Sequence, residues 1–157
     1  MAVHVVAVGR VRDPGLRAAC DGWVTRARHY FPLTVHEVAD AGRKGPTAAT
    51  SMRIEGKRLV QRVPEGAVIV ACTREGKALD SKAFAARLER WRSSGRVVAF
   101  ALGGAFGLAP DLCARAELRL ALSAFTMPHA LARAVLLEQL YRAGTMLRGE
   151  PYHKGPA

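Results

Sequence analysis

The chain has 157 residues, half of them apolar, and its 24 Lys and Arg against 13 Asp and Glu give a formal net charge of +11. This length and apolar content predict one folded domain, residues 1–157, and argue against a disordered chain. The basic excess favours a polyanionic partner, although a solvated basic surface explains it too.

The sequence shows no sign of a membrane span, a signal peptide or a metal site. No run approaches about 18 apolar residues, and the first residues lack the apolar segment and cleavage site of a signal peptide. Cys20, Cys72 and Cys113 form no CxxC pair and no zinc spacing, so we expect free, buried thiols. The expectation is a soluble, cytoplasmic protein without a bound metal.

Strand and helix patterns alternate in the first half of the chain. Short β-branched runs predict strands, and apolar residues at helical spacing predict helices. The resulting order is a strand at 3–8, a helix at 16–30, a strand at 33–39 and a helix at 47–62. The DPG sequence at 13–15 is read as a turn, Pro32 ends the first helix, and 41–46 forms a basic glycine loop.

The second half is more regular. It predicts strands at 67–72, 97–102 and 118–122, a short helix at 110–115, and a long helix from Pro128 to about Leu147. Asp80 or Ser81 caps a further helix, which carries Phe84, Leu88 and Trp91 on one face. The alternating order argues for an α/β domain with a mostly parallel sheet flanked by helices.

Three loops that follow successive predicted strands are candidates for a binding site, because ligands in such sheets bind at the carboxyl ends of the strands. They are TREGK at 73–77, GGAFG at 103–107 and SAFTMPH at 123–129. Backbone groups and apolar walls would suit a purine and a thioether better than a triphosphate. GGAFG is no P-loop, since no Lys-Ser or Lys-Thr pair follows, and VGRVRDPG lacks the GxGxxG fingerprint. A tight turn needed only for packing also explains GGAFG.

The C-terminal segment combines an apolar helix with a polar tail. Arg133 and Arg142 are expected to project away from the apolar face, which is formed by Leu131, Val135, Leu136, Leu140 and Leu147. Arg142 follows Glu138 by one helical turn and could simply pair with it, and His129 could be an ordinary helix-start histidine. The tail at 152–154 is too polar for a core and needs a partner to lie on.

Five segments of the chain match one known family. They are VVAVGR, ERWRSSGRVVAFALGG, LGGAFGL, LSAFTMPHALARAVLLEQLYRA and PYHK, which together span nearly the whole sequence. They closely resemble the small bacterial RlmH enzymes within the SPOUT methyltransferases. The resemblance implies a deep trefoil knot at about 67–157 that binds the cofactor. It also implies a homodimer, S-adenosyl-L-methionine as methyl donor, and N3 of a pseudouridine in 23S rRNA of the assembled ribosome as acceptor.

Carried over by position, the resemblance also implies site residues. The cofactor site would be Cys72, Gly103, Gly104, Leu122, Ser123, Ala124, Phe125, Thr126 and Met127. The family often has a larger aliphatic residue where Cys72 stands. Arg142, Tyr152 and His153 match polar residues around the acceptor base, with the tail reaching into the partner subunit's site.

The resemblance suggests roles for these polar residues. We expect Arg142 to stabilise negative charge that develops on the acceptor, and His153, or else His129, to take the N3 proton. Candidate RNA contacts are Arg10, Arg12, Arg43 and Lys44, although solvation explains any one of them nearly as well.

Three other functions stay open at this point. The first is a non-catalytic RNA-binding module of the same fold. The second is another nucleotide-binding α/β protein, against which the missing P-loop lysine counts. The third is a related methyltransferase that acts on tRNA, which the lack of an added RNA-binding domain disfavours.

Overall fold

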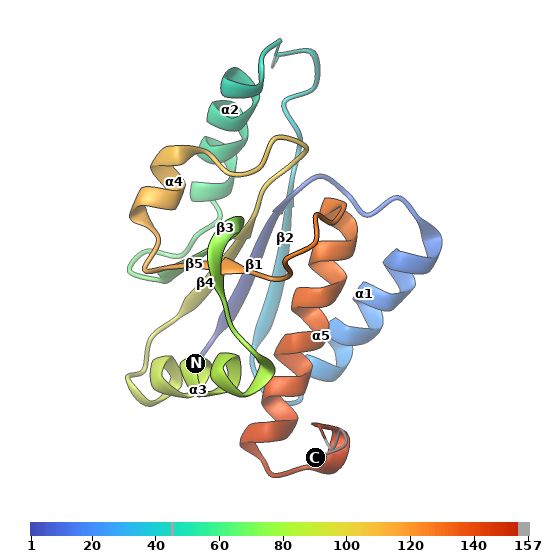
Figure 1. Ribbon diagram of the computed structural model, residues 1–157, viewed down its shortest axis with the longest axis vertical. Coiled ribbons are helices and arrows are strands. Elements are labelled where there is room, and N and C mark those ends of the chain that lie inside the picture. Colours follow the sequence, from blue (N-terminus) through green and yellow to red (C-terminus); the bar gives the residue numbers. More distant parts are fainter. Residues whose placement is uncertain (45, 154–157) are drawn as a thin grey trace.

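A five-stranded parallel sheet forms the centre of the computed structural model, which describes residues 1–44 and 46–153 (Figure 1). The strands are Val3–Val8 (β1), Leu33–Val38 (β2), Val68–Ala78 (β3), Val98–Leu102 (β4) and Leu118–Ala121 (β5). Their order in the sheet is β2-β1-β4-β3-β5, and all neighbours run parallel. The expected α/β class with a mostly parallel sheet is confirmed.

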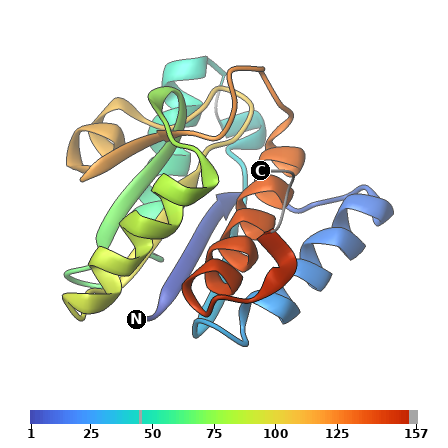
Figure 2. The same ribbon diagram turned by 60° about the horizontal axis from the view of Figure 1, so that its bottom comes forward.

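Helices cover both faces of this sheet. They are Pro14–Ala27 (α1), Ala48–Val60 (α2), Ser81–Ser93 (α3), Pro110–Arg115 (α4) and His129–Leu147 (α5), with short 3-10 helices at Gly42–Lys44 (η1) and Pro151–His153 (η2). Helices α1, α3 and α5 pack on one face, and α2 and α4 pack on the other (Figures 1 and 2). Coverage on both sides explains why β1 and β4 are almost wholly buried.

The sequence predicts no membrane-spanning segment. Within residues 1–44 and 46–153, no helix combines the length and the apolar character needed to cross a bilayer.

The start of α1 differs from the expected turn at 13–15. Asp13 is the N-cap, its Oδ1 accepting the Leu16 N–H at 2.8 Å, and Pro14 is the first helical residue. Asp before Pro is a typical helix start, so the helix begins earlier than expected, and it ends at Ala27. The expected cap of α3 is confirmed, because Asp80 Oδ1 accepts the Ala83 N–H at 2.7 Å.

Strand β3 is longer than the sequence indicated. The segment 73–77, expected to be a loop, belongs to it. Both Cys72 and Lys77 pair with Leu120 of β5, so the residues between them bulge out of the ladder. A Cβ on Gly76 would lie 2.6 Å from the Leu120 carbonyl carbon, so the absence of a side chain lets the end of this bulge close on β5.

The buried face of α5 also differs from the expected one. Leu131 is 38% exposed, whereas Arg133, expected to project away from the core, is only 3% exposed. The fully buried residues of the helix include Leu136, Leu137 and Leu140. Burial of Arg133 is compensated because its guanidinium donates to the Gly9 carbonyl at 2.8 Å and pairs with Glu37 at 3.3 Å.

Candidate active site

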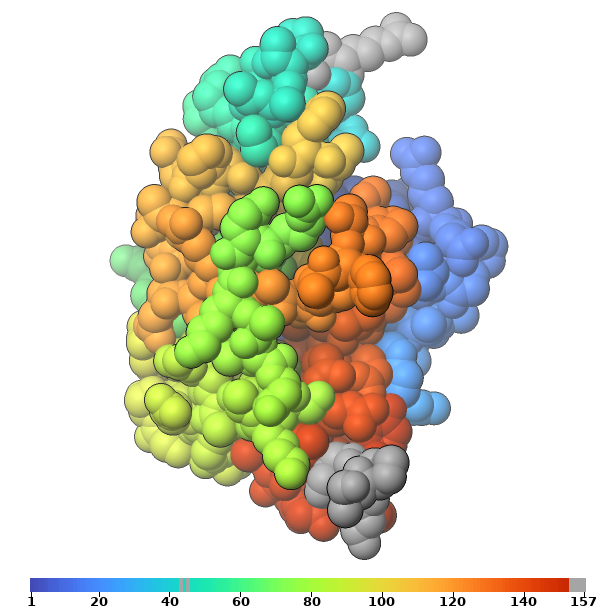
Figure 3. All heavy atoms as spheres, in the orientation of Figure 1, coloured from blue at the N-terminus to red at the C-terminus, as the bar shows by residue number. Residues whose placement is uncertain are grey.

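A pocket of about 770 Å³ lies at the carboxyl ends of β3, β4 and β5. Its walls come from the β3 bulge, the glycine loop 103–107 and the segment 122–129, which lie side by side in green, yellow and orange in Figure 3. The volume falls in the range of small-molecule sites, and the position is the usual one for ligands of parallel α/β sheets. The structure therefore brings together the three loops that the sequence singled out.

Most of the expected cofactor residues line this pocket, but Ala124 does not and is exposed. The lining residues among them are Cys72, Gly103, Gly104, Leu122, Ser123, Phe125, Thr126 and Met127. Arg74 joins two walls, since its Nη1 donates to Thr126 Oγ1 at 3.0 Å. The Ser123 Oγ accepts the Phe125 N–H at 2.9 Å and so shapes the turn that precedes α5.

The glycine loop is constrained by its own packing. A Cβ on Gly103 would lie 2.3 Å from the Gly107 carbonyl carbon, and a Cβ on Gly104 would lie 2.9 Å from Glu55 Oε2. The Gly107 N–H donates to the Gly104 carbonyl at 3.1 Å, and Gly107 has a φ of +85°. The tight-turn explanation therefore holds for these glycines, and the turn presents bare backbone to the pocket.

The pocket contains thiols that are protonated at neutral pH. Cys72 lines it from β3, and desolvation by the surrounding protein raises the pKa of its thiol to about 12. Cys72 thus acts as a small apolar wall residue and not as a nucleophile. All three cysteines are free, as expected, but only Cys20 is buried, whereas Cys72 and Cys113 are partly exposed.

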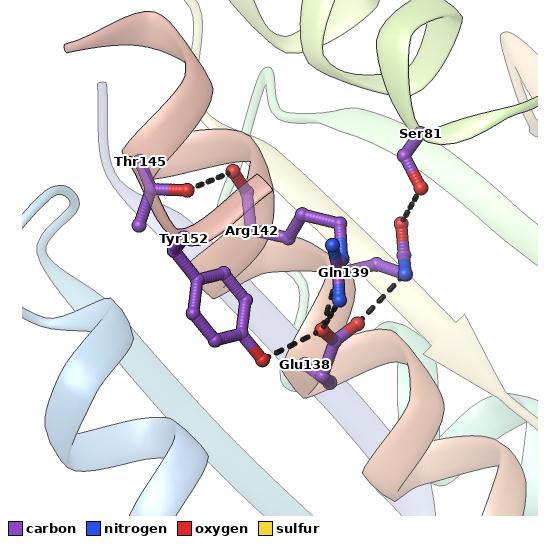
Figure 4. Close-up of polar contacts among 6 residues, drawn as sticks. All are labelled: Ser81, Glu138, Gln139, Arg142, Thr145 and Tyr152. Carbon is purple, nitrogen blue, oxygen red and sulfur yellow. Dashed lines mark hydrogen bonds and ion pairs between the residues drawn. The ribbon is translucent and has the colours of Figure 1, made fainter. Parts of the chain in front are cut away.

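Arg142 and Tyr152 belong to a second cluster, centred on Glu138 (Figure 4). Glu138 Oε1 accepts hydrogen bonds from Arg142 Nη2 at 2.6 Å, from Arg142 Nε at 2.9 Å and from the Tyr152 hydroxyl at 3.0 Å. Gln139 donates to the other carboxylate oxygen at 2.7 Å and accepts from Ser81 at 2.7 Å. The Arg142–Glu138 pair that the sequence left open is therefore present.

This cluster sets the charge of its members. The hydrogen bond to Glu138 raises the pKa of Arg142, so the guanidinium stays positive. Burial is the main cause that raises the pKa of Tyr152, and the hydrogen bond to Glu138 raises it further, so Tyr152 stays a neutral phenol. The Arg142 guanidinium carbon lies 4.9 Å from the centroid of the Tyr152 ring, and the ring centroids of Tyr152 and Tyr141 are 4.6 Å apart. This part of the tail therefore lies on its own chain.

The pocket lies at the N-terminal end of α5, and the cluster lies in the middle and second half of the helix. His129 and Ala132 line the pocket, and Arg142 follows ten residues after Ala132, which is about 15 Å along a helix axis. Within one chain, then, the structure does not bring Arg142 and Tyr152 to the expected cofactor residues. The side chain of His153 falls outside the part of the chain that the structure describes.

Some residues that line the pocket were not predicted as site residues from the sequence. Arg74 and Phe106 lie in loops already singled out, and the 56% exposure of Phe106 could not be read from the pattern. Arg119 reaches the pocket from β5, and Cys113 reaches it from α4. No local signal marks these two, because their position depends on the pairing of β5 with β3.

The remaining candidates are the basic residues expected to contact RNA and any group of metal ligands. Arg10, Arg12 and Lys44 are exposed, and the side chain of Arg43 is not among those described. Within residues 1–44 and 46–153, no group of three or more His, Cys, Asp or Glu is arranged to hold a metal ion.

Comparison with known proteins places the chain in a family. Residues 1–153 match the family described as predicted SPOUT methyltransferase. A protein of Gemmatimonas aurantiaca named ribosomal RNA large subunit methyltransferase H is 47% identical, over 98% of this chain and 100% of its own. One of the same name from Sorangium cellulosum is 50% identical, over 97% of this chain and 99% of its own.

A solved structure agrees with this at the level of the fold. The crystal structure of a probable methyltransferase from Bordetella pertussis Tohama I matches with a TM-score of 0.51 at 16% identity, covering 90% of this chain and 95% of that one. The family indicated by the sequence motifs is thus confirmed: the chain belongs to the SPOUT methyltransferases.

Proposed function

We propose that this methyltransferase transfers a methyl group from S-adenosylmethionine to N3 of a pseudouridine in 23S rRNA of the assembled ribosome. The observation that carries the proposal is the full-length match to relatives named ribosomal RNA large subunit methyltransferase H. The pocket supports it, because it lies where such a cofactor is needed and has the right size.

The pocket residues fit this cofactor. Leu102, Leu108 and Met127 supply apolar wall, and the two loops bring backbone to the pocket for contacts with a purine edge. In this proposal Cys72, Gly103, Gly104 and the segment 122–127, apart from the exposed Ala124, hold the cofactor. When bound, S-adenosylmethionine supplies an electrophilic methyl group on its sulfonium sulfur.

The Glu138 cluster fits the acceptor. N3 of pseudouridine carries a proton that must leave, and the neighbouring carbonyl oxygens gain negative charge as it does. Arg142, held positive by Glu138, stabilises that charge but cannot act as a base. Tyr152 lies beside it and helps to place the base, and His153 takes the proton. His129 is the second candidate base, because it lines the pocket.

These roles require two chains. Since the last pocket residue of α5, Ala132, and Arg142 lie about 15 Å apart along the helix, we infer a homodimer in which the tail of one subunit reaches the pocket of its partner. Exposed Phe106, Phe125 and Leu131 are apolar side chains that such an interface would cover. The proposal includes one domain over residues 1–157, a trefoil knot at about 67–157 and a cytoplasmic location, where ribosomes are present.

Methylation of intact ribosomes tests the proposal. Ribosomes from a strain without this activity are incubated with the purified protein and labelled S-adenosylmethionine, and the digested RNA is examined by mass spectrometry. We expect label in N3-methylpseudouridine of 23S rRNA, and none in free 23S rRNA. Label in tRNA would favour the tRNA enzyme, and cofactor-independent ribosome binding without transfer would favour the non-catalytic module.

A further inference from the structure

Three exposed basic side chains on α2 and η1 form no ion pair with a described residue. Some arginines elsewhere are paired with carboxylates, as in the Arg17–Glu37 and Arg96–Glu117 pairs. Among the described residues, the side chains of Arg53 and Lys57 of α2 and of Lys44 of η1 are exposed and form no ion pair or hydrogen bond. We call these three residues the α2 basic face.

The helical repeat directs this face to solvent. Arg53 and Lys57 are four residues apart and share one side of α2, while Glu55, Gly56 and Leu59 are buried on the other side. Another arginine of the helix is engaged differently, since Arg58 donates to the Ala39 and Asp40 carbonyls at 2.9 and 2.6 Å. The charges of Arg53 and Lys57 are therefore free for an external partner.

The buried side of α2 packs directly behind the pocket. Glu55 Oε2 lies 2.9 Å from the position of a Cβ on Gly104, and a Cβ on Gly56 would lie 2.9 Å from the Ala109 Cβ. The helix thus backs the glycine loop and the start of α4, and in the space-filling view it borders the yellow loop segment (Figures 1 and 3). A polyanion bound to the α2 basic face would lie on the outer side of this helix, about one helix diameter of 10 Å from the glycine loop.

The chemistry of this face fits RNA better than a lipid surface. Membrane-binding helices expose an apolar face beside their basic residues. The large apolar side chains exposed in the described residues, Phe106, Phe125, Leu131 and Tyr152, all lie outside α2. Unpaired cations at helical spacing without exposed apolar neighbours match a phosphate backbone, which is read through charge alone.

We propose that the α2 basic face binds phosphates of ribosomal RNA outside the pocket and so contributes to holding the ribosome on the enzyme. The inference rests on the proposed function for its RNA. It assigns to α2 a contact surface that is separate from the cofactor pocket and from the Glu138 cluster.

A pair of double variants tests the α2 basic face. R53Q/K57Q removes two of its charges, and K82Q/R90Q removes two other exposed charges, which form no ion pair with a described residue, from α3 on the opposite face of the sheet. Affinity for assembled ribosomes is measured across salt concentrations, with calorimetric S-adenosylmethionine binding and thermal unfolding alongside. For R53Q/K57Q we expect affinity to fall on the order of tenfold and the salt slope to drop by about 1.5. K82Q/R90Q should match the wild type, and cofactor binding should be unchanged in both.

Other outcomes separate this inference from the proposed function. If the wild type methylates ribosomes and R53Q/K57Q binds them as tightly as K82Q/R90Q does, the inference is wrong and the function stands. If the wild type neither binds nor methylates ribosomes, both are wrong. If R53Q/K57Q lost binding to phosphatidylserine vesicles but bound ribosomes as the wild type does, the assignment of the α2 basic face to RNA would be overturned. The single variant K57Q should show about half the change in salt slope, which checks that charge and not misfolding is measured.

Discussion

Gly103 shows how strongly one residue constrains the pocket. A Cβ at this position would lie 2.3 Å from backbone of Gly107, which cannot turn aside as a side chain can. We expect G103A to lower the free energy of unfolding by about 1–3 kcal/mol and to weaken S-adenosylmethionine binding, measured by urea denaturation and calorimetry. The control G22A adds a Cβ in α1 that meets nothing within 4 Å, and it should be neutral or stabilising by up to about 1 kcal/mol. Equal stability of the two variants would contradict this account.

Arg133 is a residue whose importance lies in its burial. It is 3% exposed, and its guanidinium ties α5 to Gly9 at the end of β1 and to Glu37 of β2. We expect R133M to lower the free energy of unfolding by about 3 kcal/mol. This value is at the low end for a broken buried ion pair, because Arg17 still neutralises Glu37. R92A breaks an exposed pair with Glu89, and in urea denaturation it should cost about 0.5 kcal/mol or less. Similar losses for both would show that burial of Arg133 contributes little.

At the scale of elements, β1 and β2 are joined by a pair of histidines. His4 Nδ1 and His36 Nε2 lie 3.0 Å apart, a hydrogen bond that needs one unprotonated nitrogen. Burial lowers the pKa of both rings, and His4 and Arg62 lower that of His36 further. The unfolded chain therefore takes up these protons at higher pH than the folded one. Stability should be complete above about pH 6.5 and fall as the pH drops through the lowered values.

The variant H36Q tests this pairing of elements. Unfolding by urea between about pH 5 and 7.5 should show a steep loss of wild-type stability toward low pH and a shallower one in H36Q. Parallel pH curves for the two proteins would mean that the histidine pair does not couple protonation to the β1–β2 contact. Carboxylates such as Glu37, whose pKa is lowered, contribute only at more acidic pH.

The elements also show what sequence can and cannot predict. Their order was predictable, because each buried strand is a short β-branched run and each helix has an apolar repeat. The second pairing of Lys77 with Leu120 was not, since it depends on contact between distant segments. Exposed Leu131 and buried Arg133 break the helical repeat for the same reason: the partners of Arg133 are on β2 and at the end of β1.

The candidate site was predictable to a similar extent. Its three loops could be found because the carboxyl ends of parallel strands meet at one edge. Arg119 could not, because its place in the pocket follows from the β3–β5 pairing. The roles carried over from the family remain predictions, and local sequence gives no measure of the distance between the pocket and Arg142.

At the scale of the whole molecule, the pocket lies at the N-terminal end of α5 and Arg142 of the Glu138 cluster lies about 15 Å farther along the helix. In the homodimer that we propose, two chains combine into a complete site, and each pocket receives Arg142 and Tyr152 from the partner. A dimer made of two different inactive chains would then contain one intact site, formed by the undamaged pocket of one chain and the undamaged Arg142 of the other.

Complementation between inactive variants tests this central claim most directly. S123W fills the pocket, and R142A removes the cation in the second half of α5. Each variant alone should fail to methylate ribosomes. Co-expressed in equal amounts, they should recover about a quarter of the wild-type activity, because half of the dimers are mixed and each has one intact site. If the mixed dimers form and stay inactive, each chain works with its own pocket and its own Arg142, and the two-chain site is wrong.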